Sequence, residues 1–127
     1  MKNILLTLLI CLTSSFENSQ DLNCKDFHIG KFEMDSEYGK IVITRSETSQ
    51  VEYCKEMNYK ASFDIVWKDD CTYELSNEKI QIGDKIDTNN DIKVKSKIYK
   101  IEENVFFLRV SSNIDELVID CKIKKVN

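Results

Sequence analysis

Cysteine is the residue type with the most evident chemistry in this sequence of 127 residues, which contains five of them. The last four are separated by 29, 16 and 49 residues, without a Cys-x-x-Cys motif and with only one histidine. Structural zinc sites use closely spaced Cys and His ligands, so we expect no metal site and no cofactor. In an exported chain an even number of cysteines favours disulfides, with three possible pairings. These four are Cys24, Cys54, Cys71 and Cys121.

Catalytic chemistry has few candidate residues. His28 is the only histidine, and so the only imidazole base that a Ser or Cys nucleophile could use. It lies four residues after Cys24, but a thiol–histidine pair requires a free thiol. Asp64, Asp69 and Asp70 could supply paired carboxylates for glycoside hydrolysis, yet the position of Asp69 and Asp70 between two expected strands favours a turn. We therefore assign no catalytic residue and predict that the protein is not an enzyme.

The polar segment 87–91 has oxygen-bearing side chains at its first, third and fifth positions, as calcium-binding loops do. An EF-hand also requires Gly at the sixth position and Glu at the twelfth, where this chain has Ile92 and Ile98. A solvated turn rich in Asn and Asp is the expected structure.

Five aromatic residues fall mostly on one face of successive expected strands: Phe32, Tyr53, Phe63, Trp67 and Tyr73. Such residues usually fill a core. In a barrel of about eight strands they can instead line a cavity for one small apolar ligand. We therefore predict an exported, non-enzymatic binding or accessory protein, with a small apolar-ligand carrier as the first hypothesis. A protein–protein interaction module at the cell envelope and a hydrolase with an unrecognised site are the alternatives.

Apolar and polar residues alternate from about residue 29 to the end, which predicts seven or eight antiparallel strands. Ile41 and Ile43 share one face, as do Val51 and Tyr53. The parity changes within residues 92–101, which indicates a β-bulge. A long meander shelters its edges best by closing, so we expect a lipocalin-like up-and-down barrel, with a β-sandwich as the alternative. The lysines of this segment belong on the outer face: Lys93, Lys95 and Lys97.

The first residues have the pattern of an export signal: a lysine at position 2, an apolar run over 4–12, then small polar residues. The run is about half the ~20 residues that a membrane-spanning helix needs, so we expect no permanent span. We predict a signal peptide over 1–19, a single β-rich domain over 20–127, and a secreted or periplasmic location. The net charge of −4, with interspersed lysines, argues against a nucleic-acid partner.

Several of these residues resemble a family of small exported β-rich proteins from flavobacteria and their relatives. The matching positions are Cys24, Gly30-Lys31-Phe32, Arg45, Gln50, Glu52, Trp67, Asp70-Cys71, Tyr73 and Leu75, and the resemblance covers about residues 22–76. Members often carry the name DNA topoisomerase IV, which does not fit one small acidic domain without a nucleotide site. The resemblance implies no activity.

The resemblance does imply a disulfide pairing. Family members share Cys24 and Cys71 and often lack the other two, which implies that Cys24 pairs with Cys71 and leaves Cys54 for Cys121. The strand parity places Cys121 with core residues but Cys54 with Glu52, so the second pair either needs a bulge or does not form.

Overall fold

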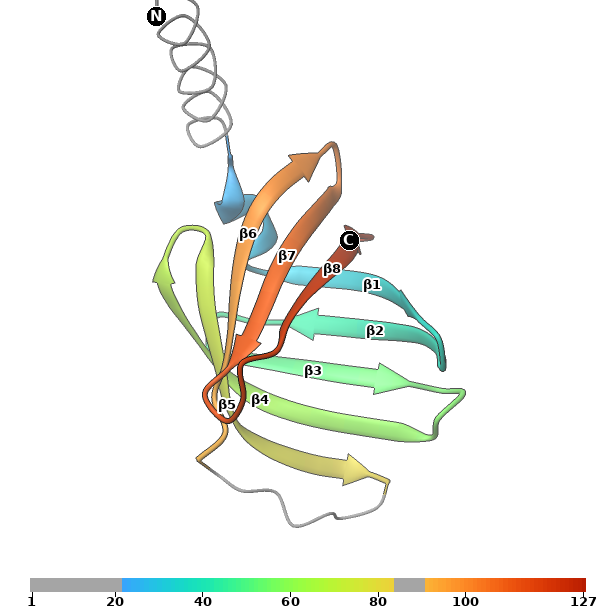
Figure 1. The fold of residues 1–127 in the computed structure, drawn as a ribbon. Coiled ribbons are helices and arrows are strands. Elements are labelled where there is room, and N and C mark those ends of the chain that lie inside the picture. The colour runs from blue at the N-terminus through green and yellow to red at the C-terminus, as the bar shows by residue number, and fades with distance from the viewer. Residues whose placement is uncertain (1–21, 84–90) are drawn as a thin grey trace, which may run out of the picture.

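The computed structural model describes residues 22–83 and 91–127. They form a short 3-10 helix and eight antiparallel strands that follow one another around a closed barrel (Figure 1). The elements are η1 (Cys24–Phe27), β1 (Gly30–Ser36), β2 (Gly39–Arg45), β3 (Ser49–Cys54), β4 (Tyr59–Asp69), β5 (Thr72–Ile82), β6 (Val94–Glu102), β7 (Val105–Ser112) and β8 (Val118–Lys125). The predicted all-β up-and-down barrel is confirmed. The expected signal peptide lies outside the described residues.

Turn residues with positive φ set where several hairpins reverse. Gly39 has a φ of +130°, and a Cβ atom there would lie 2.7 Å from Oε2 of Glu56 on the next hairpin. Asn58 before β4 and Glu103 before β7 have φ values of 49° and 55°. The register of β6 against β7 shifts between Ile98 and Lys100, which confirms the predicted β-bulge.

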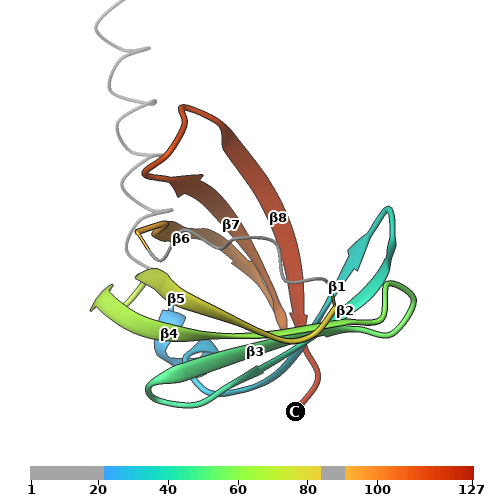
Figure 2. The same cartoon turned by 90° about the horizontal axis from the view of Figure 1, so that it is seen from below.

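The barrel consists of two sets of strands that stay together at one end and separate at the other. Strands β1–β5 pair along most of their lengths, as do β6–β8. The two sets are joined by four residue pairs between β5 and β6 and only two between β1 and β8. Figures 1 and 2 show β1–β3 running in a different direction from β6–β8. We call the end that carries η1 the closed end, and the opposite one the open end.

Aromatic side chains and a disulfide fill the closed end. The Phe27 ring of η1 lies 4.8 Å from the ring of Phe106, which in turn contacts Phe32 edge-on at 5.6 Å. Cys24 forms a disulfide with Cys71, in the turn between β4 and β5. Burying rings of this size contributes about 1.5–3 kcal/mol each, so the closed end is the stable part of the fold.

Candidate functional site: the barrel interior

Strand β3 directs polar side chains into the barrel, contrary to the prediction. Residues paired across a ladder share a face, and Glu52 is paired with Ile43 on one side and Ala61 on the other. Ile43 and Ala61 are both buried, so the Glu52 carboxylate lies among interior side chains. Tyr53, which was predicted to line a cavity, instead lies on the outer face and is 37% exposed.

Arg45 of β2 explains why β3 directs its polar side chains inwards and Val51 and Tyr53 outwards. Its guanidinium is 2% exposed and donates three hydrogen bonds, which need polar acceptors inside the barrel. Nε donates to Oε1 of Gln50 at 2.9 Å, Nη1 to the Phe27 carbonyl at 2.8 Å, and Nη2 to the Tyr73 hydroxyl at 3.1 Å. Gln50 enters the interior to meet this demand, and Glu52 follows because it lies two residues further along the same strand.

Four aromatic rings surround the Arg45 guanidinium. Its Cζ lies 4.6–6.0 Å from their centroids, within the range of cation–π attraction. Burial lowers the pKa of Arg45, and the interactions with Tyr73 and Glu52 oppose that effect. Arg45 is therefore a structural cation, because its hydrogen bonds and its charge interact with groups of the protein itself. The rings belong to Phe32, Trp67, Tyr73 and Phe106.

Glu52 connects this closed-end network to the open half. Its Oε2 accepts a hydrogen bond from Nε2 of Gln50 at 2.9 Å. Burial raises the pKa of Glu52, Gln50 and Arg45 oppose the rise, and the nearby Glu78 carboxylate adds to it. Glu78 accepts a hydrogen bond from the hydroxyl of Tyr59 at 3.2 Å, and burial beside Glu78 raises the pKa of Tyr59. The interior polar groups beyond Arg45 are thus predominantly acidic.

The raised pKa of Glu52 predicts a pH effect on stability. The unfolded chain releases this proton at a lower pH than the folded protein, so stability falls as the pH rises through the carboxyl range towards the raised pKa. Glu52→Gln cannot ionise. In denaturant titrations we expect it to match the wild type at about pH 4 and to be more stable at about pH 8. Glu102→Gln is the control, because Lys100 lowers the pKa of Glu102; equal gains in both variants would contradict the prediction.

Beyond the row that contains Phe32 and Glu52, the interior is only partly covered. Met34 and Ile41, one row further towards the open end, are half-buried. Ile119 of β8 is paired with Val110 on the interior face, yet 49% of it is exposed. Side chains that face the barrel axis and still meet solvent show that the residues in the ranges 22–83 and 91–127 do not fill the open half completely.

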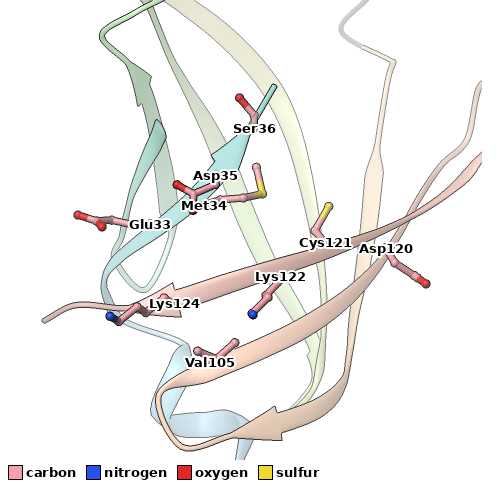
Figure 3. A pocket seen from close by; sticks show the side chains of 9 residues that line it. All are labelled: Glu33, Met34, Asp35, Ser36, Val105, Asp120, Cys121, Lys122 and Lys124. Atoms are coloured by element: carbon pink, nitrogen blue, oxygen red, sulfur yellow. The ribbon is translucent and has the colours of Figure 1, made fainter. Parts of the chain in front are cut away.

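A pocket of about 560 Å³ lies where β1 and β8 separate. Met34 and Cys121 line it from the interior faces of the two strands, whereas Cys121 and Lys122 leave β8 on opposite sides (Figure 3). Burial raises the pKa of the Cys121 thiol, and the Glu52 carboxylate contributes to the rise. The pocket therefore reaches interior side chains that lie near Glu52.

The open end also carries most of the exposed large apolar side chains. They lie in the β1–β2 turn, the β3–β4 turn, the end of β5, and the β7–β8 connection with the start of β8. A solvent-exposed apolar rim of this kind is typical of a binding entrance. Its members are Tyr38, Met57, Ile82, Ile114, Leu117, Val118 and Ile119.

The structure divides the five predicted cavity residues into three groups. Phe32 and Tyr73 are buried and Trp67 is half-buried, all packed around Arg45 at the closed end. Phe63 is half-buried on the interior face beside Gln50. Tyr53 lies outside. Sequence reasoning missed Glu52 as a site residue, although Arg45 in phase with Ile41 and Ile43 was a signal that the interior needs acceptors.

The remaining candidate residues have structural positions. The His28 ring stacks on Trp67 at 3.5 Å, and its Nε2 lies 2.7 Å from the Asp70 carbonyl oxygen. Asp69 accepts a hydrogen bond from the backbone N–H of Cys71 and makes the expected turn. Of segment 87–91, only Asp91 is among the described residues. Lys93, Lys95 and Lys97 are exposed, as predicted.

Only one of the two implied disulfides is present among the described residues. Cys24 and Cys71 are bonded, whereas Cys54 and Cys121 are free thiols. Cys54 lies on the same face as Glu52, as the strand parity predicted, but this is the interior face, where Cys54 is buried and paired with Ile41 and Tyr59. Cys121 lies on β8, whereas Cys54 lies on β3, and the pocket between β8 and β1 separates the two sets of strands at this level.

The described residues contain neither a metal-binding cluster nor a membrane-spanning helix. No group of three or more His, Cys, Asp and Glu side chains is arranged to hold a metal ion in the ranges 22–83 and 91–127. None of the helices in this part of the chain has the length and apolar character needed to cross a membrane. In comparisons with known proteins, no family model, curated protein or solved structure matches the chain.

Proposed function

We propose that this protein is an exported, non-enzymatic carrier that binds one small amphipathic molecule in the open half of its barrel. The observation that carries the proposal is the position of Glu52, a carboxylate held among interior side chains next to a partly uncovered apolar wall. Pockets of this kind, mainly apolar with a few placed polar groups, are the usual form of small-ligand sites. The apolar rim supplies an entrance, and the Cys24–Cys71 disulfide supports an oxidising compartment.

A matched pair of substitutions on β2 tests the carrier hypothesis. Ile41 faces the open half of the interior, and its neighbour Val42 faces outwards. We expect Ile41→Trp to weaken binding of the fluorescent apolar probe N-phenyl-1-naphthylamine at least tenfold, because the indole occupies the space that the probe needs. Val42→Trp should leave binding unchanged. Overpacking costs about 1–3 kcal/mol, so circular dichroism must first confirm that both variants fold.

The same pair of variants tests an outer-face alternative. A groove of about 700 Å³ crosses the outer face of β1–β5, and its apolar side chains, which include Val42, Val51 and Tyr53, favour a protein-interaction surface. Loss of probe binding in Val42→Trp but not in Ile41→Trp would show that the probe binds in this groove. Absence of binding of this probe to the wild type, together with absence of binding of the eight-carbon probes described below, would overturn the carrier hypothesis.

A further inference from the structure

The charges inside the barrel determine which class of ligand its open half can accept. Arg45 is the cation of the closed-end network, and Glu52 and Glu78 are the carboxylates of the described residues that approach the interior beyond it. Each carboxylate belongs to a different strand, and Glu78 raises the pKa of Glu52, as expected for neighbouring like charges. One arginine therefore faces two interior carboxylates, and the exposed Glu56, whose Oε2 accepts a hydrogen bond from Sγ of the buried Cys54, adds a third at the open end, so negative groups are in excess.

Among the described residues, an anionic ligand in the interior would find no available cation, because Lys122 and Lys124 of the β1–β8 pocket lie on the face of β8 opposite to Cys121. Arg45 is 2% exposed, donates to three acceptors and lies under aromatic rings, so a ligand in the open half cannot reach its guanidinium. Lys125, at the closed end, donates to the Asp26 carbonyl oxygen. Lys60 points to the outer groove, where it lines the wall. A carboxylate or phosphate placed beside Glu52 would therefore be repelled.

Glu52 also lies at a suitable depth for an amphipathic molecule. Phe32, Ile43 and Ala61 of its row are buried, and the next row towards the open end contains the half-buried Met34 and Ile41 beside the buried Cys54. A ligand whose polar head reaches Glu52 would place its apolar part against that next row. The end of this apolar part would then contact the exposed apolar rim. A cationic head would supply the missing positive charge, and buried charges need such pairing.

We infer that the ligand of this barrel is a small amphipathic amine, whose protonated nitrogen faces Glu52 and Glu78 while its apolar part lies in the open half. This inference rests on the proposed carrier function and specifies the chemical class of its ligand.

Three eight-carbon probes with different head groups test the inference: octylamine, 1-octanol and octanoate, each titrated calorimetrically at neutral pH below its micelle concentration. We expect octylamine to bind at least tenfold more tightly than 1-octanol, and octanoate to bind most weakly. Glu52→Gln should remove most of the advantage of octylamine over 1-octanol without changing the affinity for 1-octanol. Glu102→Gln is the matched control, since Glu102 is exposed at the end of β6, does not line the β1–β8 pocket and pairs with Lys100 at 2.9 Å.

Failure of the inference and failure of the carrier hypothesis give different results. If 1-octanol binds as tightly as octylamine, or octanoate binds best, the ligand is not an amine although the carrier function stands. If Glu102→Gln lowers octylamine affinity as much as Glu52→Gln does, the amine does not bind beside Glu52 and the inference is also overturned. If neither N-phenyl-1-naphthylamine nor any eight-carbon probe binds, the carrier hypothesis itself is wrong.

Discussion

Replacing Arg45 by methionine is expected to lower the free energy of unfolding by about 3–5 kcal/mol, the usual cost of removing one partner from a buried charged network. Methionine retains an apolar side chain of similar length but donates no hydrogen bond. Gln50, Tyr73 and the Phe27 carbonyl would each lose a donor in a buried environment. Glu52 would lose the cation that opposes the rise of its pKa. Urea denaturation followed by Trp67 fluorescence measures the change.

Arg109 provides the control for this measurement. It lies on the surface of β7, its side chain is 59% exposed, and it contacts Asp120 at 3.2 Å. Exposed ion pairs contribute less than about 1 kcal/mol, so Arg109→Met should change stability little. A loss below about 1 kcal/mol in Arg45→Met as well would show that the Arg45 network does not stabilise the closed end.

Removing the disulfide with Cys24→Ser and Cys71→Ser together is expected to lower the free energy of unfolding by about 4 kcal/mol in the chain-entropy model. The bond joins residues 47 positions apart and attaches η1 to the turn between β4 and β5. Without it the unfolded chain gains the conformations that this loop excludes. Thermal denaturation of the double variant beside the wild type measures the loss.

A reducing agent distinguishes the stabilisation by the Cys24–Cys71 disulfide from that of any second disulfide. Dithiothreitol should lower the melting temperature of the wild type to that of the double variant and leave the double variant unchanged, because Cys54 and Cys121 are free thiols. A further decrease in the double variant would mean that those two cysteines are also bonded, against the structure.

The sequence was sufficient to predict most of the fold because most strands follow ordinary amphipathic alternation. Ile41 and Ile43 face the interior as expected, and so do Ile65 and Tyr73. The position of the bulge in β6 also followed from a change of parity. Hydrophobic burial decides the orientation of such strands, and its period is visible in one sequence.

Strand β3 could not be predicted in this way because hydrogen bonding, not apolar burial, decides its orientation. Val51 and Tyr53 are the apolar residues of this strand, and alternation alone places them inside. The buried Arg45 requires acceptors, and satisfying it outweighs burying those two side chains. The candidate site was missed for the same reason. Sites often break the local rules of a sequence, and the inversion that hid Glu52 is also what makes the barrel interior polar.

The junction between β1 and β8 has a consequence for how the chain folds. It joins residues near opposite ends of the described chain, Phe32 with Lys125 and Glu33 with Lys124, through two ladder pairs. Bringing such distant segments together costs loop-closure entropy, and a ladder of two residue pairs offsets little of that cost. We expect the hairpins to form first and this junction, which also includes backbone hydrogen bonds between Lys31 and both Val126 and Asn127, to form last.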